Sequence, residues 1–87
     1  MARDLKAQSV RLAEKIAEHC DGVPWPLMVF LEGGPQGESP RLHYFKPNDP
    51  EWERFSRAGR GAIVGTYTRT CAVCDVAGDV LAALKML

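Results

Sequence analysis

The first part of the chain carries a hydrophobic pattern with the period of an α-helix. Over residues 3–20, apolar side chains recur along one stripe and charged side chains fall on the opposite side. The pattern stops at Gly22, which suits the left-handed position that closes many helices. Pro24 and Pro26 exclude a continuation, so we predict an amphipathic helix over residues 3–20. Its apolar stripe consists of Leu5, Ser9, Leu12, Ile16 and Cys20.

Two short strands are predicted in the middle of the chain. Residues 27–32 are mainly apolar and are bounded by helix breakers, which is typical of a buried strand. Residues 41–46 form a second strand-like segment, and Pro47 ends it. The glycine- and proline-rich residues 33–40 predict a loop between the two. Together these segments indicate an antiparallel hairpin with a long connection.

The remaining part of the chain predicts a helix, a strand and a second long helix. Residues 48–50 carry capping side chains and a proline suited to a first turn, so a short helix begins there and ends near residue 58. Residues 62–70 are rich in β-branched side chains and predict a third strand. A final helix is predicted from residue 70 or 75 to the C-terminus. Its apolar stripe consists of Val73, Ala77, Val80, Leu84 and Leu87.

The order of these elements defines the fold class. The order α-β-β-α-β-α predicts an α+β domain with helices and a small, three-stranded, mainly antiparallel sheet. A chain of 87 residues has room for one domain, residues 1–87, with one hydrophobic core. Such a small domain has a thin stability margin, and self-association is one way to widen it.

Charge and cysteine content narrow the class of protein. The 11 basic and 11 acidic side chains cancel, whereas a dedicated nucleic-acid binder usually carries a positive excess. An odd count of three cysteines cannot form a closed set of disulfides within one chain, which favours a reducing compartment. The N-terminal residues lack the apolar run of a signal peptide, and the longest apolar run, residues 26–31, is too short to span a bilayer. We therefore expect a cytoplasmic protein that does not enter a membrane.

Arginine and aromatic residues indicate where a partner would bind. Residues 54–70 carry four arginines and no acidic residue, so this segment could contact phosphates or an acidic protein surface. Trp25 stands between two prolines, and tryptophan and tyrosine often anchor protein interfaces. A solvated basic face and core packing of the aromatic side chains are the simpler alternatives. The candidate partner-binding residues are Trp25, Arg54, Arg57, Arg60, Tyr67 and Arg69.

The cysteines offer two kinds of chemical site and one packing role. Cys71 and Cys74 form a C-x-x-C motif, and Cys20 with either His19 or His43 would complete a zinc site of three cysteines and one histidine. A second tight pair of ligands is missing, so we expect no bound metal and no cofactor. A redox role of the thioredoxin type is disfavoured because the chain after Cys74 is too short for that fold. The simpler alternative is that the thiols are small buried packing groups.

Signatures of catalysis are absent from the sequence, so we expect a protein that is not an enzyme. The chain contains neither a phosphate-binding loop nor a serine nucleophile elbow. The main hypothesis is a protein-binding module, a small inhibitor or adaptor of the kind that phages or plasmids encode against a host protein complex. The alternatives are a nucleic-acid-binding regulator that uses residues 54–69 and a zinc-stabilised domain.

Self-association into a homodimer is the last expectation. The two long helices carry more apolar surface than one face of a three-stranded sheet is expected to cover, so the remainder would contact a second copy or another partner. The residues assigned to this contact are Leu5, Leu12, Ile16, Val80, Leu84 and Leu87.

Overall fold

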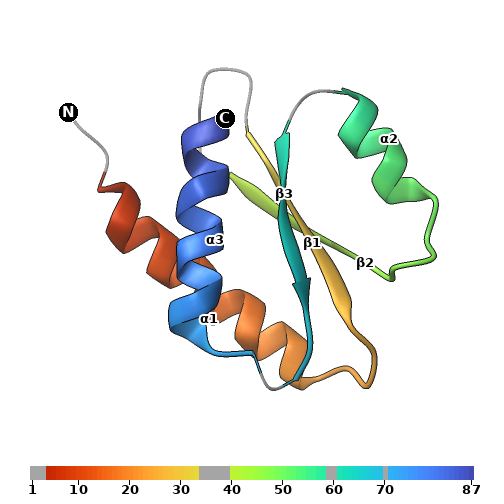
Figure 1. The fold of residues 1–87 in the computed structure, drawn as a ribbon, viewed down its shortest axis with the longest axis horizontal. Coiled ribbons are helices and arrows are strands. Elements are labelled where there is room, and N and C mark those ends of the chain that lie inside the picture. Colours follow the sequence, from red (N-terminus) through yellow and green to blue (C-terminus); the bar gives the residue numbers. More distant parts are fainter. Residues whose placement is uncertain (1–3, 34–39, 59–60, 70) are drawn as a thin grey trace.

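The computed structural model has the predicted α+β fold with the element order α-β-β-α-β-α (Figure 1). It describes residues 4–33, 40–58, 61–69 and 71–87, and residues 56–58 by their backbone alone. The described elements are α1 (Leu5–Asp21), β1 (Leu27–Glu32), β2 (Arg41–Phe45), α2 (Glu51–Ala58), β3 (Gly61–Tyr67) and α3 (Val73–Met86).

The three strands form one antiparallel sheet with the order β2-β1-β3. The central strand β1 carries most of the buried side chains of the sheet, as expected for its apolar sequence. The register between β1 and β3 shifts by one residue, because Val29 pairs with Gly65 and Phe30 pairs with Ile63. Val64 is therefore the extra residue of a β-bulge, and its side chain is buried in the core.

The elements form three layers, with α1 and α3 side by side on one face of the sheet and α2 on the other (Figure 1). The apolar stripes of α1 and α3 meet each other and the sheet, so most of the α1 stripe and the centre of the α3 stripe are buried within the chain. The expectation that these stripes remain uncovered is wrong for their central residues. The buried members of the stripes include Leu12, Ile16, Val80 and Leu84.

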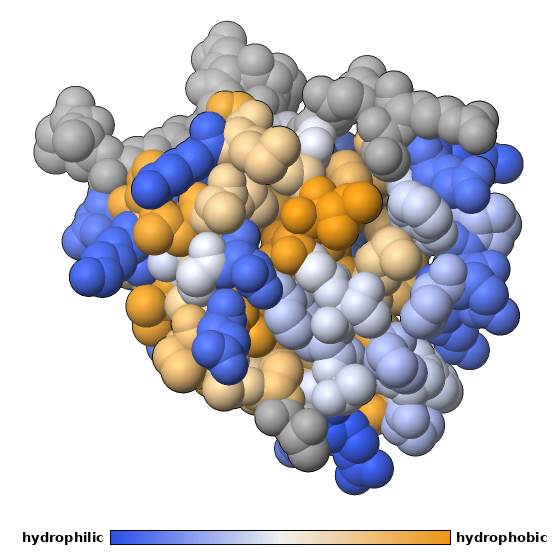
Figure 2. Space-filling view, in the orientation of Figure 1, coloured by the Kyte–Doolittle hydropathy of each residue, from blue (hydrophilic) through white to orange (hydrophobic). Residues whose placement is uncertain are grey.

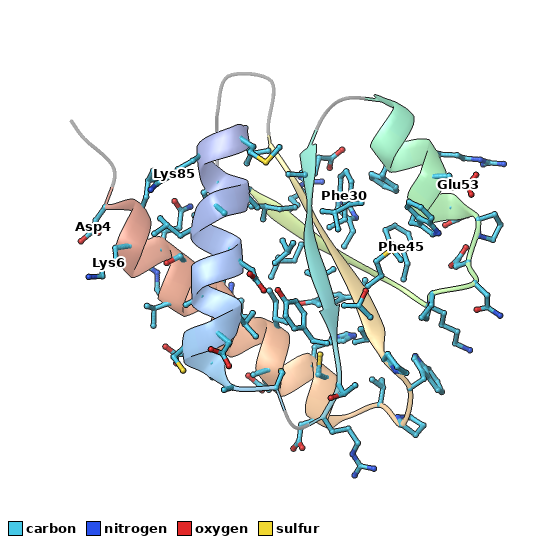
Figure 3. All side chains as sticks on the ribbon, viewed as in Figure 1. Asp4, Lys6, Phe30, Phe45, Glu53 and Lys85 are labelled. Atoms are coloured by element: carbon cyan, nitrogen blue, oxygen red, sulfur yellow. The ribbon has the colours of Figure 1, made fainter. Side chains whose placement is uncertain are left out.

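The second face of the sheet is covered through an aromatic cluster. The ring centroids of Phe30 and Phe45 lie 5.5 and 5.4 Å from that of Phe55 on α2. Phe30 and Phe45 lie on the side of the sheet that faces α2 (Figure 3). Hydrophilic side chains gather on the outer side of α2, at the right of Figure 2, as expected for a helix that packs along one narrow stripe.

The ends of the elements follow local hydrogen bonds. Asp4 caps α1, since its Oδ1 accepts a 3.0 Å bond from the Ala7 amide. The predicted left-handed closure at Gly22 is wrong, because this residue has φ −87° and its amide bonds to carbonyls of the last turn. Asp49 Oδ1 accepts a 3.0 Å bond from the Glu51 amide at the start of α2.

Candidate functional site

The most conspicuous surface residue is Trp25, in the link between α1 and β1. It is 40% exposed, although tryptophan has the largest of all side chains. Pro24 and Pro26 flank it and restrict the backbone on both sides. The Lys46 Nζ atom lies 4.1 Å from the centre of the indole, in a cation–π contact. The indole is therefore held in place while part of its surface faces solvent.

A second aromatic pair lies close to Trp25. The His19 ring at the end of α1 stacks on the Tyr44 ring of β2, with centroids 3.9 Å apart and planes 4° from parallel. Tyr44 precedes Lys46 by two residues, so both segments that hold the indole also border this pair. Figure 1 shows that the link between α1 and β1 and the end of β2 lie at the same end of the sheet. We call Trp25, Lys46, His19 and Tyr44 the Trp25 surface.

The Trp25 surface borders a shallow hollow of about 490 Å³. The charged side chains that line this hollow can contact a partner of either sign. The aromatic and aliphatic side chains of its lining offer apolar area. Burial and, secondarily, the neighbouring Cys20 raise the pKa of the Tyr44 phenol. The hollow is lined by Lys15, Glu18, His19, Gly22, Val23 and Tyr44.

The structure describes the side chains of two of the four arginines in the predicted basic segment. Arg54 is exposed on α2, before β3, and Arg69 is exposed after it. The side chain of Arg57 and the whole of Arg60 lie outside the described residues.

Tyr67, the other predicted contact residue, is held within the fold. Its hydroxyl donates a 2.6 Å hydrogen bond to Asp79 Oδ2 on α3. Burial and then the hydrogen bond to Asp79 raise the pKa of this phenol well above its ordinary value. The ring packs against the hydrophobic core, so its role in the described structure is to join β3 to α3.

The residues assigned to self-association divide into two groups. Leu5 is half-buried and Leu87 is 48% exposed, so these two remain open to a second copy. The other four are buried among the chain's own side chains and cannot form an outer contact in this fold. These four are Leu12, Ile16, Val80 and Leu84.

The zinc ligands proposed as an alternative lie on different faces of the sheet. His43 faces α2, with its ring centroid 4.6 Å from Phe55 and its Nε2 3.1 Å from Glu32 Oε1. Cys20 is buried on the opposite face, between α1 and β3, and Cys74 is exposed at the start of α3. Across the described part of the chain, no three side chains of histidine, cysteine, aspartate or glutamate are grouped to hold a metal ion.

Sequence reasoning identified Trp25 but missed the residues around it. His19 was considered only as an alternative zinc ligand, and Tyr44 was placed in the strand over residues 41–46 without a defined neighbour. The stack between them depends on how α1 crosses β2, which no local pattern encodes. The available signal was the alternation of side chains along a strand. Tyr44 points to the face of the sheet opposite to that of His43 and Phe45, which is the face that α1 and α3 cover.

No family model, curated protein or solved structure matches this chain. Among the helices of the described residues, none combines the length and the apolar character needed to cross a membrane.

Proposed function

We propose that this protein acts without catalysis by binding another protein through the Trp25 surface. The observation that carries the proposal is the exposure of Trp25 while two prolines and Lys46 fix its position. A rigid, partly exposed tryptophan loses little conformational entropy on binding and contributes a large apolar area. The neighbouring hollow provides a concave edge into which a side chain of the partner would fit.

The proposed partner is a protein complex of a host cell. This chain would be a small inhibitor or adaptor, of the kind that phages or plasmids encode, and would work in the cytoplasm. The support for this part is the size of the chain and its balanced charge of 11 basic and 11 acidic residues. A balanced surface does not depend on phosphate neutralisation, so the proposed contact is largely apolar with a polar rim.

The test compares two substitutions of equally exposed apolar residues. Trp25 and Val10 are each 40% exposed, and Val10 lies on α1 outside the Trp25 surface. Tagged wild-type protein, W25A and V10A are used for affinity purification from the native host, and recovered proteins are quantified by mass spectrometry. A specific partner is expected with wild type and V10A and is expected to fall at least about tenfold with W25A. Equal recovery with W25A would contradict the proposal.

Self-association is proposed to use the exposed part of the predicted contact, Leu5 and Leu87. The adjacent Met86 is 77% exposed, so the end of α3 presents apolar area to solvent. Sedimentation velocity over a range of concentrations tests this point. A dimer that dissociates in an L87S variant is expected, and a monomer at every concentration would remove self-association without affecting the Trp25 proposal.

A further inference from the structure

Two cysteines from distant parts of the sequence pack in the same hydrophobic cluster. Cys20 is the second-last residue of α1, and its side chain is 1% exposed. Its Sγ lies 3.9 Å from the carbonyl oxygen of Tyr67, to which the thiol donates a weak hydrogen bond. The thiol therefore faces the point where β3 ends and the chain turns toward α3.

The turn after β3 brings Cys71 back toward Cys20. The Cys71 amide donates a 3.1 Å hydrogen bond to the carbonyl oxygen of Thr68, which closes the turn. Cys71 is half-buried and packs against the hydrophobic cluster that contains Cys20. Both cysteines therefore lie beside the end of β3, and burial, with a smaller effect of Cys71, raises the pKa of the Cys20 thiol.

We propose that Cys20 and Cys71 are a reversible disulfide site that a hydroperoxide oxidises. The reaction begins when the half-exposed Cys71 thiolate attacks the peroxide, which breaks the O–O bond, forms a sulfenic acid and releases an alcohol, or water from hydrogen peroxide. Cys20 loses its proton and attacks the Cys71 sulfur, forming the S–S bond and releasing one water. The two thiols lose two electrons in total, and the peroxide gains them.

Cys20 is the better resolving partner for Cys71 than the nearby Cys74. Cys74 belongs to the first turn of α3 and is exposed, whereas Cys20 and Cys71 pack against one cluster. A bond between Cys20 and Cys71 would join the end of α1 to the segment that leads into α3. It would close a long loop of the unfolded chain and so stabilise the folded state.

The bond would also affect the Trp25 surface from behind. Cys20 follows His19 directly, and its charge contributes to the pKa of Tyr44. Fixing Cys20 to Cys71 would therefore hold the end of α1 on which the His19–Tyr44 stack depends. The disulfide itself does not depend on the proposed function, because it can be detected without any partner.

The experiment treats the full chain with a small excess of hydrogen peroxide, blocks the remaining thiols and maps disulfides by mass spectrometry of a non-reduced digest. The expected product is a cross-linked pair of peptides that contain Cys20 and Cys71. The melting temperature is expected to rise by roughly 10 °C, and dithiothreitol is expected to reverse the rise. C74S serves as the matched control and is expected to give the same bond and the same rise.

Two outcomes would overturn the proposal. One is a Cys71–Cys74 bond as the main product in the wild type, and the other is a C74S protein that forms no bond and shows no rise in melting temperature. C20A is a further check, since alanine is small and apolar at this buried site and circular dichroism establishes whether the variant folds. A folded C20A protein whose melting temperature still rises on oxidation would also contradict the assignment.

Discussion

The hydroxyl of Tyr67 and the carboxylate of Asp79 are joined by a 2.6 Å hydrogen bond, which connects the end of β3 to α3. A bond this short is typical of a hydroxyl that donates to a charged carboxylate. The ring that carries the hydroxyl crosses the backbone of Gly65, where a Cβ atom would lie 2.7 Å from the Tyr67 oxygen. The bulge at Val64 and the glycine that follows it therefore leave room for the contact between strand and helix.

Removing the Tyr67 hydroxyl is expected to destabilise the protein. The Tyr67→Phe variant keeps the ring but loses the bond to Asp79, which should lower the free energy of unfolding by about 1–2 kcal/mol. Tyr44→Phe is the matched control, because the described residues provide no hydrogen-bond partner for the Tyr44 hydroxyl. Urea unfolding of both variants measures the difference. Equal stability of Tyr67→Phe and wild type would show that the bond contributes nothing.

Stability is expected to fall at alkaline pH. Burial, with a smaller effect of Cys71, raises the pKa of the Cys20 thiol from 9.0 to about 11, and the pKa values of both tyrosines are also raised. The folded state thus keeps protons that the unfolded chain loses first, so the free energy of unfolding decreases as pH rises from about 9 through about 11. Urea midpoints measured under reducing conditions across this range test the sign.

The control for the alkaline effect is a variant without the Cys20 thiol. C20A removes one of the three groups with a raised pKa, so its stability should fall less steeply than that of wild type above about pH 9. A stability that stays constant or increases over this range in the wild-type protein would contradict the assignment of these protonated groups to the core.

The fold was predictable because each element carries a strong local signal. The strand over residues 27–32 is bounded by breakers on both sides, and the structure gives β1 those same limits. The third strand ends at Tyr67, three residues before its predicted end, because the chain turns through the Thr68–Cys71 hydrogen bond. Local propensity favours extended backbone for these β-branched residues, but it does not include the turn that brings Cys71 toward Cys20.

The candidate site was less predictable because it depends on contacts between distant residues. The sequence indicated Trp25, since the two flanking prolines exclude a helix there, but it gave no reason to place Lys46 on the indole. The sequence also could not show that α1 and α3 would cover each other's apolar stripes. A hydrophobic pattern identifies the apolar face of a helix, but it does not identify the element that packs against that face. A prediction of uncovered surface therefore failed at Ile16 and Val80, which are fully buried.

Two glycines are expected to respond in opposite ways to alanine. At Gly61, a Cβ atom would overlap the carbonyl oxygen of Leu31 and lie 2.7 Å from a ring carbon of Phe30, so Gly61→Ala should cost about 3 kcal/mol. At Gly78 on α3, the described residues place no atom beyond the adjoining helix backbone within 4 Å of the new Cβ, and Gly78→Ala should add about 0.5–1 kcal/mol through helix propensity. Urea unfolding compares the two. Similar effects of both substitutions would contradict the close approach at Gly61.

The attachment of α2 provides the last prediction. The Phe55 ring contacts Phe30, Phe45 and His43, with centroid distances of 5.5, 5.4 and 4.6 Å. Phe55 is half-buried, so the loss of its ring should cost less than that of a fully buried phenylalanine, about 2 kcal/mol. Loss of the Phe55 ring should first weaken the packing of α2 on the sheet, because the remaining core lies on the other side of the sheet.

Phe55→Ala is therefore expected to free α2 while the rest of the fold persists. Amide hydrogen exchange should become at least about tenfold faster over Glu51–Ala58, because local opening of this helix no longer breaks an aromatic cluster. Exchange around Ile16 on α1 should change little, since that side chain packs on the opposite face. Phe55→Leu, which keeps apolar contact with Phe30, is the control and should lie between Phe55→Ala and wild type. If exchange instead accelerates equally in α1 and α2, the aromatic cluster is part of a single cooperative core and α2 does not open by itself.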